Sequence, residues 1–187
     1  EWVGCAVACA GGEGELLGTD GAHLGPVLAA LTAAGCEIGR APDRLQIRRI
    51  GALRGFGALR TGPYPAFPTD AQPLLGAVAA GAWGQSRITE TIFDRRFRYL
   101  EGLTAMGAAV QTEGDTACFS GRTLHGAQVE ATDLRGGAAL TLAALGARGE
   151  SRIYGLPHID RGYQGLEGSL AALGGRIRRE TRQEAGC

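Results

Sequence analysis

The stretches that decide the fold are two apolar runs, GAVAAGA at residues 76–82 and AALTLAA at residues 138–144. Each is small and apolar on every face of a helix, and a helix without a polar face has to be buried on all sides. A third Ala-rich run, VGCAVACA, occupies residues 3–10. Three such helices predict an α/β domain with a core of helices and with strands outside, the reverse of the usual layering. The alternative is a doubly wound sheet with Ala-rich helices.

Outward from these runs, the same order of elements repeats three times. The second helix of each unit ends in LTAAG, LTAMG or LAALG, whose glycines Gly35, Gly107 and Gly174 lie 72 and 67 residues apart. Glycine just past a helix end is a common stop signal. The repetition predicts a single domain of three repeats, at about residues 1–60, 61–125 and 126–187.

The pattern also predicts the individual elements. We expect helices at residues 3–10, 24–34, 70–83, 95–106, 133–148 and 163–173. We expect strands at residues 15–18, from residue 36, and at 45–50, 86–93, 108–112, 116–120, 152–154 and 176–179. Thr19-Asp20 precedes a helix of the first unit and is interpreted as a plain cap or turn.

Composition narrows the function classes. The 187 residues suffice for one sizeable domain, and the formal net charge of zero gives no reason to expect nucleic acid or a membrane surface as partner. All 19 basic residues are Arg, which we attribute mainly to coding bias. Five cysteines without regular spacing, Cys187 among them, indicate neither a disulfide framework nor a zinc site, and free thiols fit a cytoplasmic protein. No cofactor and no transmembrane helix are predicted.

Two Thr-Asp pairs precede the buried helices of the later repeats, and they carry Asp70 and Asp133. An aspartate at a helix start is often only a cap. However, residues 61–68 read TGPYPAFP, and three prolines in this loop restrict its backbone. A rigid loop that delivers one carboxylate to a helix start could hold a general base, so Asp70 is a catalytic candidate.

Three arginines stand near predicted turns: Arg96, Arg135 and Arg161. Singly, each is most often a solvated residue or a salt-bridge partner. Equivalent ends of a threefold repeat come together in space, however, and three guanidinium groups there would bind a phosphate and a carboxylate. His158 is interpreted as a hydrogen-bonding structural residue rather than a proton-transfer group.

Several motifs together resemble one enzyme family. They are PTD at 68–70, ITETIF at 88–93, Arg96-Phe97, GAQV at 126–129, ATDLR at 131–135 and HIDRGY at 158–163. In this order and spacing they resemble the UDP-N-acetylglucosamine 1-carboxyvinyltransferases, over essentially the whole chain. The resemblance implies an inside-out α/β barrel of the enolpyruvyl transferase type. It also implies transfer of the enolpyruvyl group from phosphoenolpyruvate to the 3-hydroxyl of UDP-N-acetylglucosamine, the first committed step of peptidoglycan synthesis in the cytoplasm.

The resemblance further implies roles for individual residues. Asp70 matches the base that contacts the sugar, and Asp133 matches a carboxylate near the reacting carbon. The other matches bind substrate: the backbone of Ile92 lines the nucleotide-sugar site, Arg135 and Arg161 hold phosphoenolpyruvate, and Arg96 supports them.

The family's reactive cysteine and its N-terminal lysine belong to another half of the enzyme, and no cysteine of this chain matches. We therefore expect a C-terminal half that is inactive without an N-terminal half as partner. Two alternatives stay open. One is the sister enolpyruvyl transferase that acts on shikimate 3-phosphate, and the other is a truncated module without catalytic function.

Overall fold

The computed structural model describes residues 1–19 and 21–180. Asp20, Cys187 and the end of the third predicted repeat lie outside these residues. The first part of the chain contains α1 (Trp2–Ala10), β1 (Gly12–Leu17), the short 3-10 helix η1 (Ala22–Leu24), α2 (Gly25–Ala33), β2 (Glu37–Ala41) and β3 (Arg44–Arg49). The middle contains β4 (Gly57–Arg60), η2 (Thr69–Ala71), α3 (Gln72–Gly81), β5 (Gln85–Thr89), α4 (Tyr99–Ala105), β6 (Ala109–Glu113) and β7 (Thr116–Ser120). The last part contains β8 (Gln128–Glu130), α5 (Leu134–Gly146), β9 (Arg152–Tyr154), α6 (Leu156–Asp160) and α7 (Leu166–Ala172).

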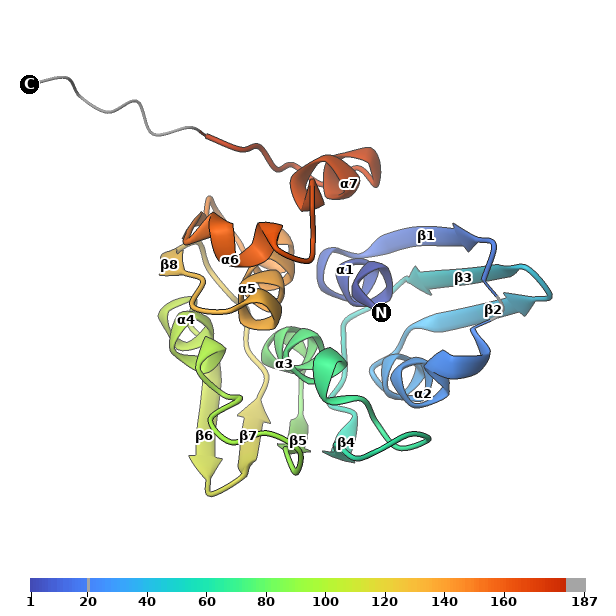
Figure 1. The fold of residues 1–187 in the computed structure, drawn as a ribbon, viewed down its shortest axis with the longest axis horizontal. Helices are drawn as coiled ribbons and strands as arrows, with labels where there is room; N and C mark the ends of the chain where they lie inside the picture. The colour runs from blue at the N-terminus through green and yellow to red at the C-terminus, as the bar shows by residue number, and fades with distance from the viewer. Residues whose placement is uncertain (20, 181–187) are drawn as a thin grey trace, which may run out of the picture.

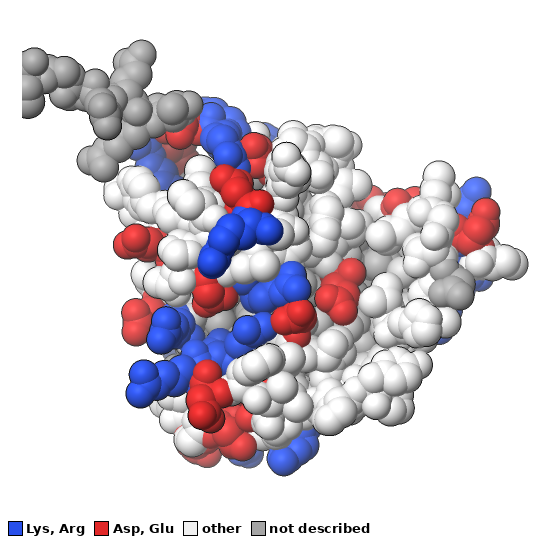
Figure 2. Space-filling model, viewed as in Figure 1, with Lys and Arg blue, Asp and Glu red and all other residues white. Residues whose placement is uncertain are grey.

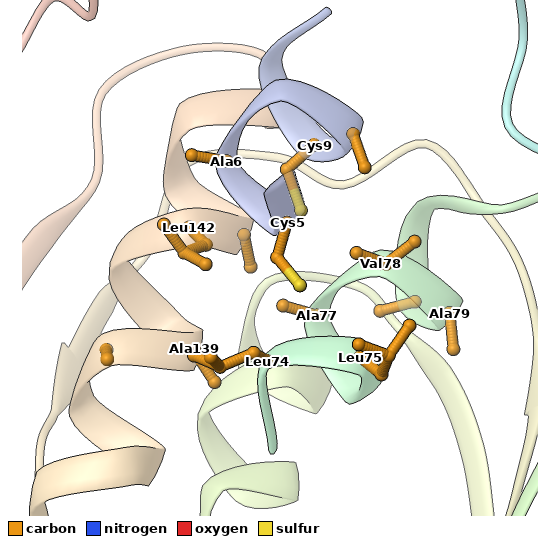
Figure 3. Close-up of a cluster of buried hydrophobic side chains, with 14 of the residues drawn as sticks. Cys5, Ala6, Cys9, Leu74, Leu75, Ala77, Val78, Ala79, Ala139 and Leu142 are labelled. Atoms are coloured by element: carbon orange, nitrogen blue, oxygen red, sulfur yellow. The ribbon is translucent and has the colours of Figure 1, made fainter. Parts of the chain in front are cut away.

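Helices α1, α3 and α5 contact one another at the centre, with the strands around them (Figure 1). Helix α3 is buried from Gln72 to Ala80, and α5 is buried from Gly136 to Ala143. Figure 3 shows side chains of all three helices pointing toward one another, among them Cys5, Leu74 and Leu142. The predicted α/β class and the helical core are therefore confirmed.

The strands form three separate sheets within the described residues. The first has the order β1-β3-β2 and is antiparallel throughout. The second has the order β4-β5-β7-β6, with β4 parallel to β5, and the third pairs β8 in parallel with β9. Along β3, Leu45 and Ile47 are buried while their neighbours are more exposed, so this sheet covers the helices with one face and meets solvent with the other.

Equivalent backbone hydrogen bonds recur one unit apart. The amide of Arg54 donates to the Ala34 carbonyl at 3.0 Å, and that of His125 donates to the Met106 carbonyl at 2.9 Å. One residue later, Gly55 donates to Trp83 and Gly126 donates to Arg148, both at 2.7 Å. The backbone connection that precedes β4 therefore has the same hydrogen bonds as the one that precedes β8, as expected for a repeated unit.

Some predicted elements differ from the observed ones. The strand predicted at 176–179 is wrong, because this segment is irregular and no strand pairs with it. Arg178 and Arg179 instead form exposed ion pairs with Glu180 and Asp160. The helix predicted from Arg95 begins only at Tyr99, since Arg95 has a left-handed backbone with φ 56°. Strands β4 and β8 and helix α6 were not predicted.

Among the described helices, none combines the length and the apolar character needed to span a bilayer.

Candidate active site

The site is centred on Asp70, which lies in η2 directly before α3. Its Oδ1 accepts a hydrogen bond from Nη2 of Arg96, and its Oδ2 accepts one from Nη2 of Arg135, each at 2.7 Å. Both contacts are also ion pairs, and such charge-assisted bonds are short and strong. Three of the residues predicted from the sequence are thus in direct contact.

This pairing changes the acidity of the groups involved. The hydrogen bond from Arg135 and the positive charges of both arginines hold the pKa of Asp70 below its ordinary value, although partial burial opposes them. The same hydrogen bond raises the pKa of Arg135. In this state Asp70 is a poor proton acceptor, because both oxygens already hold cationic donors.

Aromatic rings support the two guanidinium groups. Nη1 of Arg135 donates to the hydroxyl of Tyr163 at 2.8 Å, and its central carbon lies 5.4 Å from the centre of that ring. The central carbon of Arg96 lies 5.4 Å from the centre of the Phe93 ring. These contacts orient both side chains, since cations are attracted to aromatic faces.

Replacing Tyr163 with phenylalanine tests this support. We expect Tyr163→Phe to lower the free energy of unfolding by about 1 kcal/mol, because a partly buried hydrogen bond to a charged group is lost. Tyr154→Phe is the matched control, since its hydroxyl makes a longer 3.2 Å bond at the surface to Gln128. Urea unfolding of both variants checks the difference, and equal losses would contradict the prediction.

The Asp70 ion pairs also predict a pH dependence. Because the pKa of Asp70 is lower in the folded chain than in the unfolded chain, its stabilisation is present above about pH 4 and is lost as the pH falls through the folded value. The carboxylate is 49% exposed, so the effect is small. Urea unfolding of wild type and Asp70→Asn should differ more at about pH 6 than at about pH 3. A difference that is the same at both pH values would argue against the pairing.

Asp133 lies at the same end of α5 as Arg135. It is the N-cap of that helix, and its Oδ1 accepts a hydrogen bond from the amide of Gly136 at 2.8 Å. This is the capping arrangement that aspartate favours. The cap fixes the carboxylate at the helix start, while its predicted catalytic role stays a prediction.

Arg161 is the least engaged of the predicted arginines. Its Nη2 lies 3.3 Å from Nδ1 of His158, and both side chains are exposed. The neighbouring Gly162 packs against Leu134, which places Arg161 near the start of α5. Among the ion pairs formed within residues 1–19 and 21–180, none involves Arg161.

Ile92 lies in the loop after β5, and the residue is 40% exposed. Its amide donates to Oε1 of Glu90 at 2.8 Å, and this turn explains why the strand predicted to reach residue 93 ends at Thr89. Glu90, which is only 4% exposed, was not among the predicted site residues. Alternation along β5 was the available signal, since it places Glu90 on the same face as the buried Ile88.

Figure 2 shows blue and red side chains interleaved over the ends of α3, α4 and α6, while the surface over α2 is mostly uncharged. Of the three paired residues, Asp70 lies directly before α3, Arg135 lies in the first turn of α5, and Arg96 lies in the loop before α4.

With this geometry established, comparison with known proteins identifies the family. A family model described as EPSP synthase (3-phosphoshikimate 1-carboxyvinyltransferase) matches residues 5–170. The chain belongs to the EPSP synthase family. Similar curated members are a UDP-N-acetylglucosamine 1-carboxyvinyltransferase of Gluconacetobacter diazotrophicus, 45% identical over 94% of this chain, and a UDP-N-acetylglucosamine 1-carboxyvinyltransferase 3 of Symbiobacterium thermophilum, 43% identical over 94%. The chain spans 42% and 41% of their lengths, respectively.

Solved structures of the family have the same fold. The enolpyruvyl transferase NikO from Streptomyces tendae superposes with a TM-score of 0.81 at 27% identity, covering 95% of this chain and 43% of NikO. An EPSP synthase from Acinetobacter baumannii superposes with a TM-score of 0.70 at 22% identity over the same shares, which supports the fold alone.

Proposed function

We propose that this chain supplies one side of the active site of an enolpyruvyl transferase that joins phosphoenolpyruvate to the 3-hydroxyl of UDP-N-acetylglucosamine. The observation that carries the proposal is the Asp70 carboxylate held between Arg96 and Arg135 at the starts of two buried helices. A base and anion-binding guanidinium groups in contact are what the reaction needs. The names of the relatives at 41–45% identity support this acceptor.

For Asp70 to act as the base, its carboxylate has to exchange one hydrogen-bond partner, Arg135, for the sugar hydroxyl. The hydroxyl oxygen of the sugar forms a bond to C2 of phosphoenolpyruvate while a proton is added to C3. The C2–O bond to phosphate then breaks, and a proton leaves C3. We propose that the anionic groups of phosphoenolpyruvate draw Arg135 away from Asp70. The carboxylate then accepts the hydroxyl proton, because its pKa rises when a cationic donor leaves.

The other predicted residues would complete this side of the site. Arg161 would add a second guanidinium group for phosphoenolpyruvate, and the loop at Ile92 would contact the nucleotide sugar. Asp133 would lie near C3, where the proton is exchanged. The reactive cysteine would come from a further domain equivalent to the part of the relatives that this chain does not span. We place the reaction in the cytoplasm, at the start of peptidoglycan synthesis.

A chimera tests the proposal. This chain would replace the matched 42% of the Gluconacetobacter diazotrophicus relative. We expect the chimera to release phosphate from phosphoenolpyruvate when UDP-N-acetylglucosamine is present, and the 187-residue chain alone to release none. A folded chimera that is inactive, or that uses shikimate 3-phosphate instead, would overturn the proposal. Calorimetric titration of the chain with UDP-N-acetylglucosamine, with and without phosphoenolpyruvate, gives an independent measure of binding.

A further inference from the structure

Glu90 is a buried carboxylate outside the contacts of the arginines just described. It is 4% exposed, and its oxygens accept four hydrogen bonds from three segments of the chain. Oε1 accepts from the Thr61 hydroxyl at 2.9 Å and from the amides of Ile92 at 2.8 Å and Phe93 at 3.2 Å, whereas Oε2 accepts from the Thr69 hydroxyl at 2.9 Å. Burying a charge is costly unless hydrogen bonds satisfy it, and here they do.

Two of the three segments that Glu90 joins lead to the candidate site. Thr69 directly precedes Asp70. Phe93 supplies the ring over which Arg96 lies, and Arg96 in turn holds Oδ1 of Asp70. Glu90 therefore reaches the Asp70 carboxylate by two separate routes, one through Thr69 and one through Phe93.

Thr61, the residue directly after β4, holds the Glu90 loop in place. Thr61, which donates to Glu90, also accepts a hydrogen bond on its hydroxyl from the amide of Thr91 at 2.8 Å. The Thr91 hydroxyl donates back to the Thr61 carbonyl at 2.8 Å. The loop from Glu90 to Phe93 is thus held by Thr61 as well as by its own hydrogen bonds to Glu90.

We propose that Glu90 is a positioning residue, which sets the place of the Asp70 carboxylate and of the Ile92–Phe93 loop relative to each other. Through these groups it would align the base with the nucleotide sugar. The effect of Glu90 on turnover rests on the proposed function.

Two substitutions at Glu90 separate position from charge. In Glu90→Gln, the side-chain oxygen still accepts from the Ile92 and Phe93 amides, and the new NH₂ group donates to the Thr69 hydroxyl, which can also accept. Glu90→Ala removes every contact. A positioning role therefore predicts that glutamine preserves the site and that alanine does not.

NMR of the full 187-residue chain tests the structural claim. In Glu90→Ala we expect the Ile92 amide to exchange with solvent at least about tenfold faster, because it loses its acceptor. We also expect the carboxyl carbon signal of Asp70 to titrate at a higher pH, as its contacts with Arg96 and Arg135 loosen. Glu90→Gln should leave both close to wild type, and unchanged methyl signals from Leu75 and Leu142 confirm an intact core. Unchanged exchange and titration in Glu90→Ala would overturn the proposal.

Thr69→Val covers the case in which Glu90→Ala does not fold. It removes only the donor to Oε2, so the Asp70 titration should shift while exchange of the Ile92 amide stays as in wild type. A Thr69→Val chain with an unchanged Asp70 titration would contradict the route through Thr69.

Kinetics of the chimera test the consequence separately. Glu90→Ala should lower kcat and raise KM for UDP-N-acetylglucosamine, so that kcat/KM falls by about tenfold or more. Glu90→Gln should keep most of the wild-type kcat/KM. If the wild-type chimera is inactive, the proposed function fails while the NMR result still decides the role of Glu90. If it is active and Glu90→Ala matches it, the positioning role fails.

Discussion

In the chimera described above, Asp70→Asn should lower turnover by about 100- to 10,000-fold, the usual contribution of a positioned general base. Asparagine has nearly the same shape as aspartate, but it has one side-chain oxygen in place of the two that accept separately from Arg96 and Arg135, so one of these two contacts is lost. It cannot take a proton from the sugar hydroxyl at neutral pH. The loss should therefore appear mainly in kcat, measured by release of phosphate.

Asp94→Asn is the matched control for this variant. Asp94 is exposed in the loop between Phe93 and Arg95, and it loses the same charge in the substitution. Its turnover should stay close to wild type. A similar loss in both variants would mean that negative charge in this region matters rather than the chemistry of Asp70. Full turnover in Asp70→Asn would remove Asp70 from the proposed mechanism.

The second large effect concerns the close approach of the central helices. Gly146 is the last residue of α5, and a methyl group there would overlap the carbonyl oxygen of Cys9 and lie 3.0 Å from its carbon. Main-chain atoms of α1 cannot turn aside as a side chain can, so the helices would have to separate. We expect Gly146→Ala to lower the free energy of unfolding by about 1–3 kcal/mol, the range for overpacking.

Gly81→Ala is the matched control, because Gly81 is the last residue of α3. Apart from the adjoining residues and the backbone of its own helix, no atom lies within 4 Å of the position that its methyl group would take. Alanine favours a helix over glycine by up to about 1 kcal/mol, so this variant should be as stable as wild type or more stable. Urea unfolding of the two chains checks the contrast. Equal stability of both variants would show that α1 and α5 are not packed as described.

The comparison with EPSP synthases bears on the choice of acceptor. The description of the matching family model names EPSP synthase, the shikimate enzyme. The curated relatives at 41–45% identity are instead named UDP-N-acetylglucosamine 1-carboxyvinyltransferases. The EPSP synthase from Acinetobacter baumannii is only 22% identical. Substrate choice in the chimera is therefore the decisive measurement between these two acceptors, because the fold is common to both.

Much of the fold follows from local sequence. The runs at residues 76–82 and 138–144 have no polar face, and that property predicts helices buried on all sides, with strands outside them. The stiff loop before Asp70 and the ATDLR motif likewise placed two candidate carboxylates at helix starts, where the structure has them.

Only the tertiary structure decided which side chains meet. Arg135 lies 65 residues after Asp70, and their contact depends on α3 and α5 packing side by side. Glu90 could be placed on a buried face by alternation, but its four donors come from three segments that no local pattern connects. The predicted strand at residues 176–179 failed for the same reason, since a strand forms only where a neighbour offers hydrogen bonds. The periodicity of apolar residues predicts whether a residue is buried. The side chains that it contacts depend instead on how elements distant in the sequence pack together.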